Sequence, residues 1–278
     1  MPTTLDQIVA SARRRVASAK PLANRADLAR RAAEHVPRGF ASAVRRAAAG
    51  APAVVAELKK ASPSRGVIRG SFHVCDLAYQ LASAGAAALS VLTDEEYFQG
   101  SLACLCEASA AVDLPCLRKD FIIDEFQLLE SRANHADAVL LIVAALTATE
   151  LRRLHAVARE FSLDVLCEVH DEDELGRALD LGCDIIGVNS RDLRTFQVDL
   201  NTALRLGRNI PPGVLKVAES GIGSGTDIRR LRDAGYEAFL IGESLMRAEF
   251  PGEALKQLLA EAKSVESKPQ SPVISAQP

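Results

Sequence analysis

The sequence predicts a (β/α)8 barrel of the TIM-barrel class, preceded by a helical extension. From residue 53 onward, short apolar runs alternate with amphipathic helical stretches at a repeat of roughly 25 residues. Apolar strands between amphipathic helices indicate a parallel sheet that is covered on its outer face. Eight such units close best as a barrel. The alternative, a doubly wound open sheet, would be expected to carry G-x-G-x-x-G after its first strand, and the sequence has none there.

Three segments are expected along the chain: a helical extension over residues 1–50, the barrel over 51–262, and a polar, disordered tail over 263–278. In the extension, apolar residues recur at helical spacing from Leu5 to Val16, and a second helix runs from about Arg25 to His35. The predicted barrel strands are Ala53–Leu58, Ala87–Leu92, Pro115–Leu117, Ala138–Val143, Leu163–Glu168, Ile185–Val188, Val214–Ala218 and Ala238–Ile241. The helices predicted between them include Leu102–Val112, Glu125–Asn134, Thr149–Phe161, Glu172–Leu181 and Thr226–Ala234.

Composition and charge exclude several classes of protein. With 48% hydrophobic residues the 278-residue chain is too apolar to be disordered, yet no apolar run approaches the roughly 20 residues that span a bilayer. A formal net charge of -3 argues against a nucleic-acid partner. The N-terminus lacks the order of a secretory signal, so we expect a cytoplasmic protein. Six cysteines without a C-x-x-C pair and five histidines without ligand spacing predict no metal site.

Charged side chains end several of the predicted strands, where a barrel of this class has its active site. Because side chains alternate between the interior and the helix layer, residues two apart share a side. Each charge alone would fit a salt-bridged rim residue, but three carboxylates and two of the eight lysines converge on one mouth. The residues placed there are Glu57, Lys59, Lys119, Phe121, Glu168, Asn189, Arg191 and Glu219. His170 shares the side of Glu168 but lies beyond the strand, so we expect a loop residue rather than a catalyst.

Glycines after the last two strands predict a phosphate site. Gly221 and Gly223 follow the seventh strand, and Gly242 with Glu243 follows the eighth. Glycines just before helix N-termini expose backbone N–H groups to an anion, and barrels of this class often hold phosphate at these two loops. Ordinary turn glycines are the alternative. Glu243 would repel a phosphate, so its side chain must point away while its N–H donates.

Seven stretches of the barrel match one family pattern in order: AELKKASPSRG (56–66), SVLTDEEYFQGS (90–101), LRKDFIIDEFQ (117–127), LCEVHDEDEL (166–175), IGVNSRDL (186–193), AESGI (218–222) and LIGESLM (240–246). On these stretches the chain resembles the indole-3-glycerol phosphate synthase family of tryptophan biosynthesis, from about residue 40 to 262. In that family the N-terminal extension covers the barrel mouth. The resemblance implies that the catalytic residues are Glu57, Lys59, Lys119, Glu168, Asn189, Glu219 and Ser220. It also implies that Ser62, Gly221, Gly242 and Glu243 hold phosphate, that Arg191 supports the polar residues, and that Phe98, Phe121, Leu140 and Leu193 form an apolar slot.

The reaction that the resemblance implies converts 1-(2-carboxyphenylamino)-1-deoxyribulose 5-phosphate to indole-3-glycerol phosphate, with loss of carbon dioxide and water. Ring closure needs an acid that protonates the ketone, which an ammonium such as Lys119 can supply. Dehydration needs a base and an acid, and the sequence does not divide these roles among Glu57, Glu168 and Lys59. No pyridoxal, metal or nicotinamide cofactor is required. The expected partner is therefore the small-molecule substrate alone, bound by a monomer or weak homodimer.

Two other functions compete with this interpretation. A phosphoribosylanthranilate isomerase barrel would be expected to use a Cys/Asp pair at strand ends. Cys116 and Cys167 instead lie within their strands, at positions whose side chains should face the helix layer. A degenerate barrel that only binds a metabolite or a partner protein would be expected to lose some of the charges at the mouth, and all are present. The basic, glycine-containing loop over residues 60–72 is expected to move over the substrate.

Overall fold

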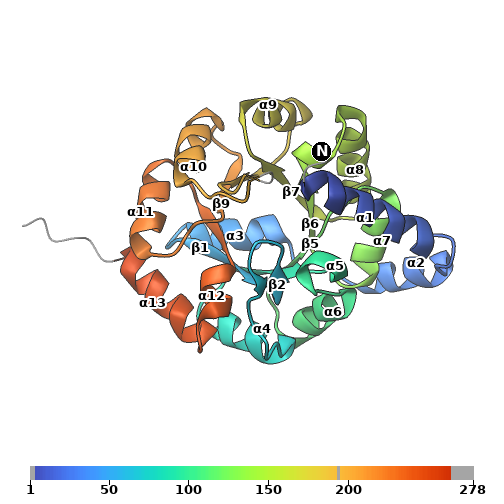
Figure 1. The fold of residues 1–278 in the computed structure, drawn as a ribbon, viewed down its shortest axis with the longest axis horizontal. Coiled ribbons are helices and arrows are strands. Elements are labelled where there is room, and N and C mark those ends of the chain that lie inside the picture. Colours follow the sequence, from blue (N-terminus) through green and yellow to red (C-terminus); the bar gives the residue numbers. More distant parts are fainter. Residues whose placement is uncertain (1–3, 193–194, 264–278) are drawn as a thin grey trace, which may run out of the picture.

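The computed structural model describes residues 4–192 and 195–263. Eight parallel strands close into a barrel in which each strand pairs with its neighbours along the chain and the first pairs with the last. This confirms the predicted (β/α)8 class, and Figure 1 shows the ring of helices around the strands. The strands are β1 (Ala53–Leu58), β4 (Ala88–Leu92), β5 (Cys116–Lys119), β6 (Ala138–Ile142), β7 (Asp164–Val169), β8 (Ile185–Asn189), β9 (Leu215–Glu219) and β10 (Ala238–Ile241).

The helices outside the barrel bury their apolar faces against the strands. The covering helices are α4 (Val74–Ser83), α6 (Leu102–Ala111), α7 (Glu125–Ala133), α8 (Ala148–Glu160), α9 (Glu172–Leu181), α10 (Leu200–Leu206), α11 (Gly225–Asp233) and α13 (Pro251–Lys263). Shorter elements lie in the loops: β2 (Ala61–Ser62), β3 (Gly66–Val67), α5 (Glu95–Phe98), η1 (Val143–Ala145), η2 (Gly207–Asn209) and α12 (Glu243–Arg247). Among the described residues, no helix combines the length and apolar character needed to cross a bilayer.

Two separate apolar cores follow from the alternation of side chains along the strands. Val54, Ala56 and Leu58 of β1 pack outward against the helices, whereas Ala53 and Val55 pack inside the barrel. The inner core fills the barrel interior, and polar residues stand at the carboxyl ends of β1, β5, β7, β8 and β9. Whether a strand residue can reach the mouth therefore depends on which of the two alternating faces of the strand it occupies.

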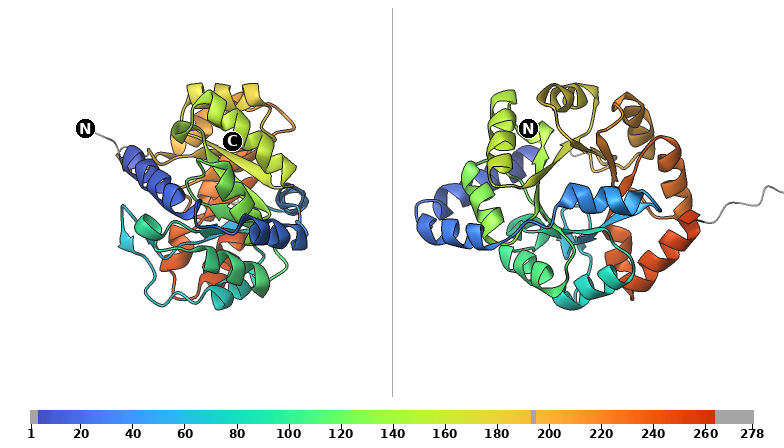
Figure 2. Two further views of the ribbon diagram at one scale, coloured as in Figure 1. Left: turned by 90° about the vertical axis from the view of Figure 1, so that its right-hand side faces the viewer. Right: turned by 180° about the vertical axis from the view of Figure 1, so that it is seen from behind.

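The N-terminal extension reaches both ends of the barrel. It forms α1 (Thr4–Ala19), α2 (Arg25–Glu34) and α3 (Phe40–Ala48), the last of which was not separately predicted. Helix α1 lies across the mouth, where Ile8 and Ala12 join the inner core. Helix α3 closes the opposite end, since Phe40 joins the same core and Arg45 donates to the carbonyls of residues that precede β8 and β9. The view from behind in Figure 2 shows α3 crossing that end.

Candidate active site

A cavity of about 640 Å³ opens at the carboxyl ends of the barrel strands. Leu193 lies outside the described residues, but every other residue that the sequence predicted for the site lines this cavity. They are Glu57, Lys59, Ser62, Phe98, Lys119, Phe121, Leu140, Glu168, Asn189, Arg191, Glu219, Ser220, Gly221, Gly242 and Glu243. Residues from all eight strand ends are thus brought to one concave site, although they are spread over almost 190 positions of the sequence.

Lys119 is the centre of the charged cluster in this cavity. Its Nζ donates to Oε2 of Glu168 at 2.7 Å and lies 3.2 Å from Oε2 of Glu219. Both carboxylates are buried, and Oε1 of Glu219 has no hydrogen-bond partner among the described residues. Room for Glu219 comes from Gly187 on the adjacent strand, because a Cβ there would collide with that same oxygen. Two buried acids therefore share one ammonium.

Burial and charge pairing pull the pKa values of this cluster apart. Burial disfavours the ammonium of Lys119, but Glu168, Glu219 and Glu57 outweigh this and raise its pKa. Burial also acts against ionised Glu168, yet Lys119 and His170 hold the pKa of Glu168 well below its usual range. For Glu219, burial dominates, the neighbouring Glu168 adds to it, and its pKa rises to about 8. At neutral pH the cluster thus holds an ionised carboxylate, an ammonium and a protonated carboxyl group.

A second ion pair lies at the end of β1. Lys59 Nζ is 2.6 Å from Oε2 of Glu57, which is itself buried. Gly242, across the β1–β10 pairing, leaves the space that this carboxylate occupies, since a Cβ there would overlap it. Asn189 accepts the backbone N–H of Arg191 at 3.0 Å through its side-chain oxygen, so its amide group remains a donor for a ligand.

The predicted phosphate end of the cavity combines tight backbone turns with arginines. Ser220 has φ 65°, which is uncommon for a residue other than glycine, and Gly221 follows with φ 76°. The carboxylate of Glu243 does not stand alone beside them: it lies 3.1 Å from Arg65 and 3.4 Å from Arg191. These cations offset the repulsion that Glu243 would exert on a phosphate.

The opposite wall of the cavity is apolar. The rings of Phe98 and Phe121 lie with centroids 6.3 Å apart and tilted by 36°, and Leu140 is buried beside the inner core. Leu5 and Ile8 of helix α1 also line the cavity. The sequence analysis placed these two residues on an apolar helix face but assigned them no part in the site. Their spacing shows that the face is buried, but it does not show which part of the protein the face packs against.

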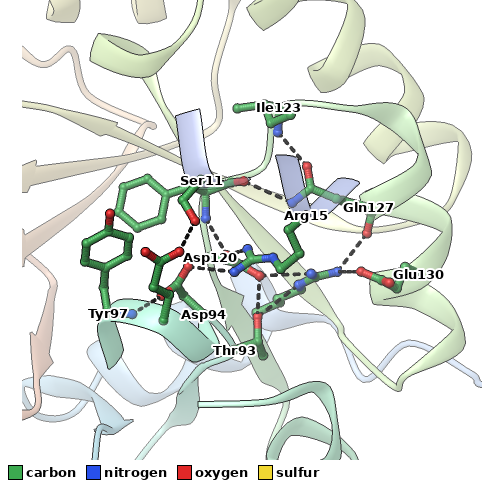
Figure 3. A network of polar contacts seen from close by, with 12 residues as sticks. Ser11, Arg15, Thr93, Asp94, Tyr97, Asp120, Ile123, Gln127 and Glu130 are labelled. Atoms are coloured by element: carbon green, nitrogen blue, oxygen red, sulfur yellow. Dashed lines mark hydrogen bonds and ion pairs between the residues drawn. The ribbon is translucent and has the colours of Figure 1, made fainter. Parts of the chain in front are cut away.

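Helix α1 is fixed over the mouth by a charged network that Figure 3 shows from close by. Arg15 donates to Asp94 at 2.7 Å and to Asp120 at 2.8 Å; Asp94 is the second residue after β4 and Asp120 the first after β5. Asp120 also accepts from Thr93 at 2.7 Å, and one turn earlier on α1 Ser11 contacts Glu96. The network positions Leu5 and Ile8 at the cavity.

His170 lies in the loop between β7 and α9 and does not line the cavity, in keeping with the expectation, but it contacts a residue that does. Its side chain is 13% exposed, and its Nε2 lies 3.3 Å from Oε1 of Glu168. The cysteines, by contrast, take no part in the cavity: all six are free thiols, and none is among the lining residues. Burial raises the pKa of Cys116 to about 12. Among residues 4–192 and 195–263, no group of three or more candidate metal ligands occurs.

Comparison with known proteins places the whole barrel in one sequence family. The family model described as indole-3-glycerol phosphate synthase matches residues 5–258. A protein of that name from Koribacter versatilis is 58% identical over 259 residues, covering 93% of this chain and 100% of that one. Another from Polaromonas naphthalenivorans is 49% identical over 266 residues, covering 94% and 100%.

Solved structures add support for the fold alone. A mutant tryptophan synthase alpha-subunit from Pyrococcus furiosus aligns with a TM-score of 0.59 at 13% identity, over 76% of this chain and 98% of that one. A thiamine phosphate pyrophosphorylase from the same organism aligns with a TM-score of 0.56 at 16% identity, over 74% and 93%. Identities this low carry no argument about chemistry.

Proposed function

The chain belongs to the indole-3-glycerol phosphate synthase family, and from this premise we propose that its barrel mouth closes the indole ring of 1-(2-carboxyphenylamino)-1-deoxyribulose 5-phosphate. The observation that carries the proposal is the position of Lys119, whose side chain is 13% exposed and lies between two buried carboxyl groups in the cavity that Phe121 also lines. A cation in a dry site stabilises negative charge that develops on a substrate oxygen and can donate a proton to it.

Ring closure forms a bond between the aryl carbon that bears the carboxylate and the ketone carbon of the substrate. Lys119 donates a proton to the ketone oxygen, which becomes a hydroxyl group. The bond to the carboxylate then breaks, carbon dioxide leaves, and its electron pair remains in the ring system. In the last step the hydroxyl leaves as water with a proton from an acid, and a base removes a proton from the carbon next to nitrogen. Glu57, Lys59, Glu168 and Glu219 are the ionisable groups at hand for that step.

Substrate orientation follows from the two unlike ends of the cavity. We assign the phosphate to the turns after β9 and β10, where Ser220, Gly221 and Gly242 lie with Arg191. The aromatic ring then lies against the apolar wall around Phe121. Because the carboxylate is held at the polar cluster, it is turned out of conjugation with the ring, which helps it to leave.

The hairpin of β2 and β3 is the element that we expect to close over the bound substrate. Arg65, at its tip, reaches across the mouth to Glu243, while Arg69 is anchored to the carbonyls of Met246 and Ala248. One end of the loop is thus fixed and the tip is held by an exposed ion pair. Protection of this loop from protease by a substrate analogue supports closure, and equal cleavage with and without the analogue contradicts it.

The isomerase alternative receives no support from the geometry, because it needs a cysteine at the mouth and none of the six lines the cavity. We also propose a cytoplasmic location and a small molecule as the physiological partner. The six thiols, all unpaired, are in keeping with a reducing compartment.

The test is the appearance of indole fluorescence on mixing the protein with the carboxyphenylamino-deoxyribulose phosphate. The chain has no tryptophan, so background emission is low. We expect Lys119→Ala to lower kcat by about 10³-fold and Lys256→Ala, at an exposed lysine of α13 that does not line the cavity, to leave it unchanged. A folded wild type that binds the substrate without forming indole would overturn the proposed function and favour a binding role.

A further inference from the structure

His170 occupies an unusual position between two carboxylates. It follows β7 directly, two residues after Glu168, and its Nε2 lies 3.3 Å from Oε1 of that residue. On the other side, Nδ1 lies 3.0 Å from Oε2 of Glu174 on α9, and the same oxygen accepts the backbone N–H of His170 at 2.8 Å. Glu174 therefore fixes both the backbone and the ring, and the ring lies between the two carboxylates, behind Glu168 rather than among the residues that line the cavity.

This contact makes the two carboxyl groups around Lys119 unequal. Glu168 has a basic group near each oxygen: Lys119 donates a hydrogen bond to Oε2, and His170 Nε2 lies at ion-pair distance from Oε1 without hydrogen-bond geometry. Glu219 has only the shared Lys119 at Oε2, and its Oε1 is buried without a hydrogen-bond partner among the described residues. The one neighbour that distinguishes them is His170.

Few other charges can produce this difference. The charged groups that face the pair are Lys119 from β5, His170 after β7, Glu174 from α9 and Glu57 from β1. Strands β6 and β8, which flank β7, contain no ionisable residue. Glu57 acts on Lys119 and is itself paired with Lys59.

We propose that His170 is a positioning residue: as an imidazolium held by Glu174, it keeps Glu168 ionised and turned toward Lys119, so that Glu219 carries the proton. Burial alone would lower the pKa of His170, but Glu168 and Glu174 raise it to about 10, in keeping with a charged ring at neutral pH. The catalytic consequence rests on the proposed function. In dehydration, Glu168 accepts the proton from the substrate carbon and Glu219 donates one to the leaving hydroxyl. Lys119 contacts both groups and offers the route by which the proton returns.

The charge state of His170 can be tested without any catalytic activity. Ring-nitrogen NMR shifts of protein labelled with ¹⁵N-histidine, assigned by comparison with His170→Asn, report protonation directly. We expect His170 to remain an imidazolium across neutral pH, and Glu174→Gln to lower its midpoint by about one pH unit or more. A midpoint near the ordinary value of 6.5 in the wild type would overturn the proposal whether or not the protein is a synthase.

The catalytic consequence needs a kinetic readout that a loss of packing does not imitate. We expect His170→Asn to lower kcat about tenfold or more, to leave KM nearly unchanged, and to move the acidic limb of the kcat profile toward higher pH by about one unit, because Glu168 loses a cation. The matched control is His155→Gln, a buried histidine of α8 that does not line the cavity.

An unshifted acidic limb in His170→Asn, or the same changes in His155→Gln, contradicts the positioning role. If the wild type forms no indole at all, the proposed function fails, while the NMR titration still decides the state of His170.

Discussion

The two sides of strand β5 carry charge clusters of opposite character. On the inner side, Lys119 faces Glu168 and Glu219, and one oxygen of Glu219 has no hydrogen-bond partner among the described residues. On the outer side, the preceding residue, Arg118, faces Asp120, and both side chains are buried. The clusters are one residue apart in sequence, and Asp120, which follows β5, also reaches the cavity.

The outer cluster is fully paired. Arg118 donates to Thr93 at 3.1 Å, to Asp120 at 2.9 Å and to the carbonyl of Gln127 at 3.0 Å. Asp120 accepts in addition from Arg15 of helix α1. A buried network with every partner present is rigid, whereas an acid that shares a cation and lacks a partner is ready to exchange protons. The difference separates side chains that hold the barrel and α1 together from those that we assign to chemistry.

The strongest way to break this comparison is to substitute Arg118. We expect Arg118→Met to lower the free energy of unfolding by about 3 kcal/mol, because Asp120 then keeps a buried charge with fewer partners. Urea unfolding followed by circular dichroism measures this. Lys119→Ala is the matched substitution one residue away, and it should cost less stability while it abolishes most of the turnover. A stable Arg118→Met protein with unchanged unfolding would show that the outer cluster is not structural.

A smaller effect is expected from the link between the outer cluster and helix α1. Arg15→Met removes the ion pairs to Asp94 and Asp120. Because the arginine is partly exposed, we expect the free energy of unfolding to fall by only about 1–2 kcal/mol. Because Leu5 and Ile8 line the cavity from the same helix, KM should rise more than kcat falls. The neighbouring exposed Arg14→Met is the control, measured in the same steady-state assay. Equal KM values for the two variants would show that the anchoring of α1 by Arg15 does not contribute to substrate binding.

Sequence alone predicted the inner cluster better than the outer one, for a physical reason. The alternation of side chains along a strand is local, so Glu57, Lys119 and Glu168 could be assigned to the mouth from parity. The partner of Arg15 depends on how α1 docks, which no local pattern specifies. His170 lies past the end of β7, where parity no longer applies, and its ring direction is set by Glu174 across a turn.

The smallest and most specific contrast is the pH dependence of stability. Burial alone would raise the pKa of Asp120, but Arg118 and Arg15 outweigh it and hold that pKa below 3.8. Asp120 therefore contributes its full stability above about pH 4 and loses it as the pH falls further, so the destabilisation caused by Asp120→Asn should shrink in acid.

Glu219 should behave in the opposite sense, because burial raises its pKa from 4.5 to about 8. As the pH rises between these values, the unfolded chain loses the proton while the folded protein retains it, and this lowers the wild-type stability. Glu219→Gln should thus gain stability relative to wild type between about pH 5 and 8. Urea unfolding at a series of pH values measures both variants. If the change in the free energy of unfolding depended on pH in the same way for Asp120→Asn and Glu219→Gln, the two carboxyl groups would not differ in pKa as their partners indicate.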